Sequence, residues 1–315
     1  FFYTHTPPYP ILSGLVGSEM CIRDRSIIPF DDRDGYIWLN GEMMPWRECK
    51  THVISHGLHY ASLVFEGERA YNGKIFKSKD HTNRLFNSAK ILDFEIPWSL
   101  EKIEDTKLEL LETMKLSNSY VRAFAWRGSE MIAVSAQHTK IHTAIAVWEW
   151  PSYFDPETKM KGIKLDISNW RRPPANCAPV HAKAAGLYMI CTLAKHEAEK
   201  KGFDDTLMLS HDGLIAEATG ANIFFRMSDG NIHTPLPKTF LNGITRTTII
   251  DLLKAKDLEV IERDIELEEL KNVTECFLTG TAAEVTPVGK IAEFEFKPGN
   301  LCKEILGSYS ELVRA

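Results

Sequence analysis

Apolar side chains alternate, or recur every three to four residues, along most of the chain from about residue 30 onward. Tyr36–Leu39 and Glu42–Trp46 flank Asn40-Gly41, and Asn-Gly suits the positive φ angles of a tight turn, so this stretch predicts a β-hairpin. Tyr120–Trp126 has a strict period of two. It predicts a strand with the valine and the two alanines on one face and the larger side chains on the other.

Helical spacing recurs in both halves of the chain. A helix is predicted over 79–92, where Ser78 offers an N-cap, and a second over 100–116. In the second half a helix over 184–200 ends before Gly202, a residue typical of helix C-termini. The remaining expected elements are strands near 75–76, 143–150, 163–168, 206–210, 214–217, 222–226, 232–234, 258–264 and 275–280, helices near 245–256 and 266–271, and turns at Asp212-Gly213 and Asp229-Gly230.

The order of these elements predicts two domains, which suits a chain of 315 residues. Pro151, Pro156 and Gly162 make 151–162 the natural linker. We therefore expect an N-terminal α/β domain over 26–150 and a C-terminal domain over 163–315. The pattern of hairpins and turns predicts that many of the strands are antiparallel. The expected fold class is therefore mixed α/β, of the α+β type.

Residues 1–25 do not fit this organisation. The segment LVGSEMCIRDR at 15–25 reverse-translates to a sequence resembling the transposase adapter of sequencing libraries, and 1–14 have neither helical nor strand period. We expect 1–25 to be an artefact of the gene sequence, disordered and no part of the fold. The alternative is a natural leader, although the basic segment and longer apolar run of a secretory signal are both missing.

Composition excludes several classes of protein. Hydrophobic residues are 44% and charged residues 25% of the chain, as in globular proteins, and the net charge of −6 argues against a nucleic-acid partner. No run of eighteen apolar residues predicts a membrane span. The cysteines after residue 25 are odd in number and lack CxxC spacing, which argues against a zinc site or a disulfide framework and favours the reducing cytoplasm. They are Cys49, Cys177, Cys191, Cys276 and Cys302.

Candidate chemistry comes from a series of short segments in a set order. GxGxxG, GxxxxGK[ST], GxSxG and HExxH are all absent, so nothing supports a nucleotide-binding, P-loop, hydrolase or metalloprotease interpretation. The segments are GLHYASLVFEGERAY (57–71), HTNRLFNSAK (81–90), YVRAFAWRG (120–128), VHAKAAGLYM (180–189), HDGLIAEATGANIFF (211–225), LNGITRTTI (241–249) and FLTGTAAEVTPV (277–288).

Together these segments resemble the class IV, fold-type IV aminotransferases that use pyridoxal 5'-phosphate, and most closely the branched-chain amino-acid aminotransferases. The resemblance covers about residues 30 to 315. It implies a small N-terminal α/β domain, a larger C-terminal mixed-sheet or pseudo-barrel domain, and reversible amino transfer between L-leucine, L-isoleucine or L-valine and 2-oxoglutarate. D-amino-acid transaminase, (R)-amine transaminase and aminodeoxychorismate lyase share this fold and stay open, as does an inactive cofactor-binding protein.

The resemblance also implies roles for particular residues. Pyridoxal phosphate needs a lysine that holds it covalently and moves the Cα proton, and Lys183 is that catalytic residue by resemblance. Glu217 would keep the ring nitrogen protonated, and Tyr188 would hydrogen-bond the phenolic oxygen. Asn222 follows Glu217 in the matching segment. The phosphate would lie at the start of a helix, where backbone N–H groups hold anions; its expected partners are Arg84, Ile244, Thr245, Gly280 and Thr281.

The substrate side rests on the same resemblance. Tyr120 and Arg122 lie two apart on one strand face, where such a pair helps to hold the distal carboxylate of glutamate. The α-carboxylate would rest on backbone N–H groups near Thr281 and Ala282 and at the Gly220 turn. The apolar walls would be Tyr60, Phe65, Gly67 and Trp150, each of which could equally be a core residue.

Four segments depart from the family pattern. They are Ala61-Ser62, Glu68, Met131–Val134 and Arg171-Arg172, and they leave the side-chain preference open rather than the cofactor. In relatives, the loop at Met131–Val134 reaches into the neighbouring subunit's pocket. The resemblance therefore implies a homodimer or a larger homo-oligomer, with small-molecule amino acids and 2-oxo acids as partners and no metal.

Overall fold

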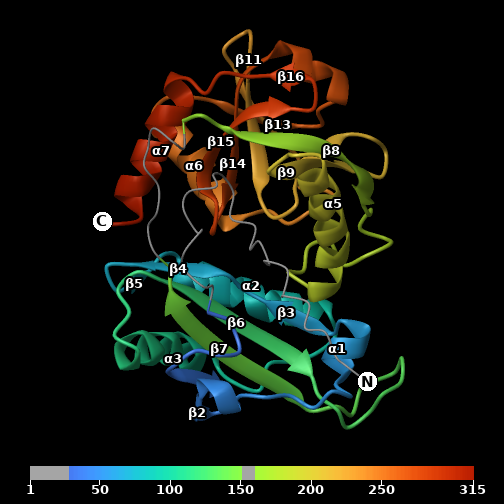
Figure 1. The fold of residues 1–315 in the computed structure, drawn as a ribbon, viewed down its shortest axis with the longest axis vertical. Helices are drawn as coiled ribbons and strands as arrows, with labels where there is room; N and C mark the ends of the chain where they lie inside the picture. Colours follow the sequence, from blue (N-terminus) through green and yellow to red (C-terminus); the bar gives the residue numbers. More distant parts are fainter. Residues whose placement is uncertain (1–27, 151–159) are drawn as a thin grey trace, which may run out of the picture.

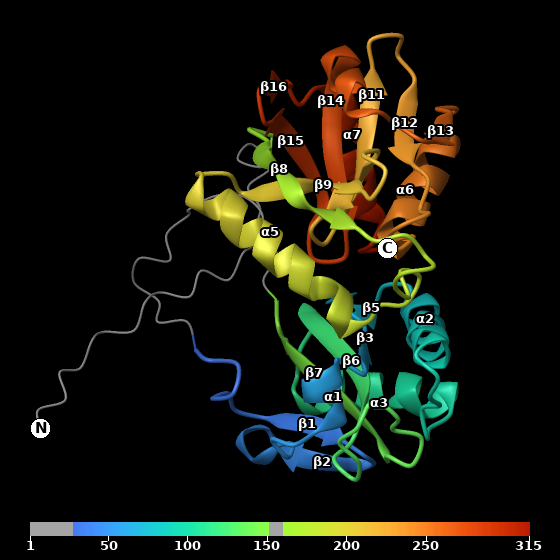
Figure 2. The same cartoon turned by 90° about the vertical axis from the view of Figure 1, so that its right-hand side faces the viewer.

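A computed structural model describes residues 28–150 and 160–315. Figure 1 shows two sheet-containing bodies stacked along the long axis, the N-terminal one below and the C-terminal one above, and Figure 2 shows the same arrangement from the side. The predictions for 1–25 and for most of the linker lie outside the described residues. The division into domains at 151–162 stays a prediction.

The N-terminal body is built on an antiparallel sheet of seven described strands. Their order is β2-β1-β7-β6-β4-β5, with β3 also paired to β6. The strands are β1 (Tyr36–Leu39), β2 (Glu42–Pro45), β3 (Leu63–Phe65), β4 (Glu68–Tyr71), β5 (Lys74–Ile75), β6 (Ser119–Arg127) and β7 (Ile141–Glu149). The helices are η1 (Trp46–Glu48), α1 (His56–Tyr60), α2 (Ser78–Ile91) and α3 (Leu100–Thr113).

The C-terminal body is built on a mixed sheet of nine described strands. The order is β10-β9-β8-β15-β14-β11-β12-β13, with β16 beside β15, and β8 runs parallel to both of its neighbours. The strands are β8 (Ile163–Arg172), β9 (Asp205–Ser210), β10 (Ile215–Ala218), β11 (Asn222–Met227), β12 (Ile232–Pro235), β13 (Val260–Arg263), β14 (Val273–Gly280), β15 (Glu284–Ile291) and β16 (Phe294–Glu295). The helices are η2 (Ala185–Tyr188), α5 (Met189–Lys200), α6 (Ile244–Lys254), η3 (Leu267–Asn272) and α7 (Asn300–Leu312).

The apolar periodicity of the strands and helices explains how each body buries a hydrophobic core. The small residues predicted to share one face of β6, Val121, Ala123 and Ala125, are fully buried, and they pack with Leu85 of α2 and Leu110 of α3 in one core. The C-terminal sheet has one core on each side. Among the described residues no helix is long and apolar enough to cross a membrane.

Several local predictions are confirmed and others need correction. The hairpin forms as β1–β2, with positive φ at Asn40 and Gly41. Ser78 is not an N-cap: Lys77 takes that position with a φ of 50°, and the Ser78 hydroxyl donates to Glu68 instead. The helix predicted over 184–200 is divided into η2 and α5. The apolar pattern did not reveal β3, β4, β15 or α7.

Candidate active site

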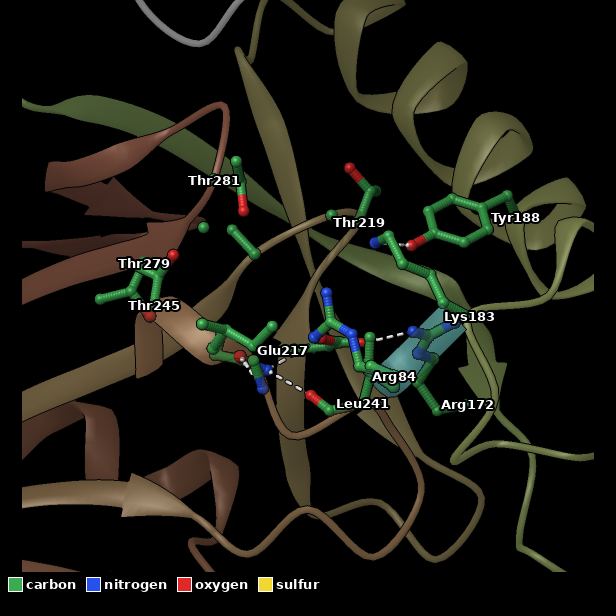
Figure 3. A pocket seen from close by; sticks show the side chains of 16 residues that line it. Arg84, Arg172, Lys183, Tyr188, Glu217, Thr219, Leu241, Thr245, Thr279 and Thr281 are labelled. Carbon is green, nitrogen blue, oxygen red and sulfur yellow. Dashed lines mark hydrogen bonds and ion pairs between the residues drawn. The ribbon is translucent and has the colours of Figure 1, made fainter. Parts of the chain in front are cut away.

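One pocket lies where α2 of the N-terminal body meets the C-terminal sheet and the start of α6 (Figure 3). It is lined by every residue predicted to bind the cofactor, which are Arg84, Lys183, Tyr188, Glu217, Asn222, Ile244, Thr245, Gly280 and Thr281. The sequence alone assigned no cofactor-binding role to the other lining residues, which are Arg172, Thr219, Gly220, Ala221, Leu241, Gly243 and Thr279. Segments up to about 200 positions apart in sequence thus converge on one site.

Lys183 is held from both bodies. Its Nζ lies 2.9 Å from the Tyr188 hydroxyl, so the two predicted partners meet. Its backbone N–H donates to Ser88 Oγ of α2 at 3.0 Å, and its carbonyl accepts from the N–H of Phe65 at 3.1 Å. The small residue that follows, Ala184, bridges to β3. The N-terminal body therefore fixes the peptide from which the lysine side chain enters the pocket.

Glu217 of β10 is a buried carboxylate, 4% exposed. Its Oε2 accepts from Asn222 Nδ2 at 3.1 Å, and its Oε1 accepts from Nη2 of Arg172. Burial raises the pKa of Glu217, while Arg172 and then Lys183 act in the opposite direction. The sequence offered one signal for Arg172, the unusual pair of arginines before the lysine segment.

The opposite end of the pocket presents unpaired donors. Helix α6 starts at Ile244, and its N-cap residue Gly243 supplies no side-chain cap, so N–H groups of the first turn remain available. The hydroxyl of Thr279 is buried and has no hydrogen-bond partner among the described residues. Thr245, also buried, stands in the first turn of the helix. A helix start with free N–H groups and hydroxyls beside it suits a phosphate.

Arg84 reaches this pocket from α2 while held by a buried carboxylate. Its Nε and Nη2 donate to Glu66 at 2.7 and 2.8 Å, and His81 donates to the same carboxylate at 2.7 Å. Glu66 is fully buried. Burial alone would raise the pKa of Glu66, but Arg84 and His81 outweigh it and hold that pKa well below its usual range.

Four of the eight substrate candidates form a cluster that adjoins the pocket through Phe65. The Phe65 ring lies 5.0 Å from the Tyr188 ring, and the Arg122 guanidinium lies 4.6 Å from Phe65. Arg122 Nη2 donates to the Tyr120 hydroxyl at 3.4 Å, and the Tyr120 ring lies 5.1 Å from that of Trp150.

Of the other four substrate candidates, Thr281 lines the pocket itself. Gly67 packs against the same cluster, and a Cβ there would lie 2.0 Å from the Tyr120 hydroxyl and would force it to move. Ala282 follows the pocket residue Thr281 in the turn between β14 and β15. Tyr60 does not line the pocket; its side chain is exposed and its ring stacks on that of His56.

These residues fit pyridoxal phosphate on chemical grounds. An amine with a phenol beside it, a buried carboxylate and an uncapped helix start with an unpartnered hydroxyl match the carbonyl carbon, ring nitrogen and phosphate of that cofactor. Within 28–150 and 160–315 no group of three or more His, Cys, Asp or Glu could hold a metal ion.

The chain belongs to the class IV aminotransferase family, whose model, described as "Amino-transferase class IV", matches residues 63–291. A solved structure of the branched-chain amino acid aminotransferase from the organism abbreviated T.th., with pyridoxamine 5'-phosphate, superposes with a TM-score of 0.87 at 38% identity. The match covers 90% of this chain and 96% of that one. The predicted fold class, a two-sheet fold-type IV architecture, is thereby confirmed.

Relatives of known sequence are similar to the chain over nearly its whole length. The probable branched-chain-amino-acid aminotransferase of Rickettsia bellii is 41% identical over 89% of this chain and 96% of its own. The branched-chain-amino-acid aminotransferase of Pseudomonas aeruginosa is 40% identical over 90% of this chain and 94% of its own. A further structure of the T.th. enzyme holds N-(5'-phosphopyridoxyl)-L-glutamate.

Proposed function

We propose that this protein is a branched-chain-amino-acid transaminase. It uses pyridoxal 5'-phosphate to transfer an amino group reversibly between L-leucine, L-isoleucine or L-valine and 2-oxoglutarate. The observation that carries the proposal is the pocket in which Lys183 and Tyr188 lie 2.9 Å apart, with Glu217 and the start of α6 on the same lining. The names of the relatives support the substrate class.

Bound pyridoxal phosphate supplies a carbonyl carbon that takes up the amino group and a ring that withdraws electrons from the substrate Cα. Lys183 would hold it covalently and would move the proton at the substrate Cα. The Tyr188 hydroxyl orients Nζ. Glu217 would hold the ring nitrogen, and the first turn of α6 with Arg84 would hold the phosphate.

The substrate cluster explains how one pocket can serve two unlike side chains. The Phe65 ring offers an apolar surface to leucine, isoleucine or valine. The Arg122 guanidinium, 4.6 Å from that ring, offers a charge to the distal carboxylate of 2-oxoglutarate or glutamate. Among the described residues the hydrogen-bond partner of Arg122 is the neutral Tyr120 hydroxyl rather than a carboxylate, which leaves its charge for a substrate.

The test is a panel of amino donors with 2-oxoglutarate as acceptor. We expect L-leucine, L-isoleucine and L-valine each to yield L-glutamate and the branched 2-oxo acid in equal amounts. Lys183→Ala should lose this activity, whereas Lys200→Ala, which removes an exposed lysine of α5, should keep it. Turnover with D-alanine or an (R)-amine in place of the L-amino acids, or lyase activity on aminodeoxychorismate, would contradict the proposal.

We also propose that the enzyme is a homodimer or larger homo-oligomer and that it works in the cytoplasm. Large apolar side chains are unusually exposed at Val53 (69%), Leu58 (69%), Val134 (88%) and Met189 (64%), as expected of surfaces covered by a second copy. All five cysteines of the described residues are free thiols, which suits a reducing compartment. Sedimentation of the protein and of Val134→Asp tests the assembly: a wild-type monomer would refute it.

A further inference from the structure

Arg172 is a buried guanidinium in contact with Glu217. It ends β8, is 8% exposed, and donates through Nη2 to Glu217 Oε1. Its Nη1 donates to the carbonyl of Leu187 and to Cys191 Sγ, both at 3.4 Å, which ties it to η2 and α5. Figure 3 shows Arg172 and Glu217 on the lining of the same pocket. A full positive charge is thus built into the site.

The charges around Glu217 can be assigned one by one. Arg172 of β8 and Lys183 favour its anion, and Asn222 of β11 is neutral. Cys191 of α5 is a neutral thiol, because burial raises its pKa to about 11. The amine of Lys183 is engaged and released during the reaction. Arg172 is therefore the cation that acts on Glu217 throughout.

We propose that Arg172 is a positioning residue that keeps the proton shared by Glu217 and the ring nitrogen of the cofactor on the ring. This inference rests on the proposed function. The Arg172 guanidinium is hydrogen-bonded to the Glu217 carboxylate and would lie farther from a ring nitrogen bound to that carboxylate. Because Coulomb energy falls with distance, Arg172 stabilises the carboxylate anion more than it destabilises the positive charge on the ring.

Without Arg172, burial dominates at Glu217. A buried carboxylate prefers its neutral form, so the proton would move from the ring nitrogen to the glutamate. An unprotonated ring withdraws electrons from the substrate Cα less strongly. Arg172 would in this way control the protonation of the ring without touching the substrate.

The test compares four variants with the wild type. Arg172→Met removes the charge, Arg172→Gln removes the charge but keeps a hydrogen-bond donor, and Arg172→Lys restores a cation. Arg171→Met is the matched control, because it removes one positive charge from the exposed neighbouring residue of the same strand. Each protein is loaded with pyridoxal phosphate labelled with ¹⁵N in the ring, and the ¹⁵N chemical shift is recorded between pH 6 and 9.

We expect the shift of a protonated ring nitrogen in the wild type and in Arg171→Met. Arg172→Met and Arg172→Gln should both move toward the unprotonated value, and Arg172→Lys should return toward the wild type. Both charge-removing variants should also lose at least about tenfold in affinity for pyridoxal phosphate, the equivalent of one pKa unit, but not for its 1-deaza analogue. The two variants guard against mistaking a misfolded protein for a positive result.

A protonated ring nitrogen in every Arg172 variant that binds the cofactor would overturn the inference. Equal losses of affinity for both forms of the cofactor would overturn it too, since they would indicate a purely structural role. Failure of the proposed function looks different: the wild type itself would then bind no pyridoxal phosphate.

Discussion

Ser88 provides the most direct check on how the two bodies cooperate at the active site. It lies one helical turn beyond Arg84 on α2, is fully buried, and accepts the backbone N–H of Lys183 at 3.0 Å. Ser88→Ala deletes the acceptor and leaves that N–H without a partner. Leaving a buried donor unsatisfied costs about 1–3 kcal/mol.

Two measurements should register this loss. The melting temperature should fall by several degrees, since 1 kcal/mol corresponds to about 2–4 °C in proteins of 150–250 residues. kcat/KM should fall about tenfold or more for L-leucine and L-valine alike. A misplaced Lys183 stabilises the transition state less, and each 1.4 kcal/mol added to the activation free energy lowers the rate about tenfold. The substrate pocket itself is unchanged, so the ratio between the two amino acids should stay constant.

The matched control is Ser78→Ala, which removes a hydroxyl from the same helix. Ser78 contacts Glu68 and Lys107 at 3.3 Å and has no hydrogen bond to Lys183. We expect its kcat/KM to remain at the wild-type value. A Ser88→Ala enzyme with wild-type kcat/KM and melting temperature would refute the view that α2 anchors the catalytic lysine.

Three further predictions concern stability and reactivity. The pKa of Glu66 lies below its usual value of about 4.5 in the folded protein, so the ionised carboxylate contributes fully to the free energy of unfolding above pH 4.5. This contribution is lost as the pH falls further. Glu66→Gln should therefore flatten the fall of the unfolding free energy at acid pH, measured by urea titration. Glu275 accepts the N–H groups of three residues at the start of α7, so Glu275→Ala should lower the unfolding free energy by about 1–2 kcal/mol, and an unchanged value in denaturant would argue against the cap. Iodoacetamide at pH 8 should modify the exposed Cys177 before the buried Cys191, whose pKa is raised to about 11; peptide mass mapping would show the reverse order if the burial were wrong.

The parts of the fold that could be predicted from the sequence are those whose signal lies in neighbouring residues. The Asn40-Gly41 turn and the period-two pattern of Tyr120–Trp126 depend only on neighbouring residues, and both predictions hold. Strand β15 was missed because Glu284–Ile291 contains Pro287 and lacks a clear alternation. Strand β4 is polar and buried, and it was missed because Glu68 and Arg69 are residue types typical of a surface. In the structure their charges are paired with residues distant in sequence, Lys107 and Glu284.

The same distinction applies to the site. Residues carried by the resemblance, such as Lys183 and Glu217, converge on one pocket. The groups that support them could not be recognised in this way. Ser88 is 95 positions from Lys183, and Arg172 is 45 positions from Glu217, so no local pattern links either pair. Their roles follow from packing between segments, which sequence spacing does not encode.

The central claim is that Lys183 carries pyridoxal phosphate for transfer of an amino group from branched L-amino acids. The most direct measurement is the visible absorbance of the protein after addition of pyridoxal phosphate, recorded before and after L-leucine and then 2-oxoglutarate. We predict a band of covalently held cofactor that L-leucine abolishes and 2-oxoglutarate restores, and that Lys183→Ala does not form. A protein that gains no such band, or one whose band responds to D-alanine and not to L-leucine, would contradict the account.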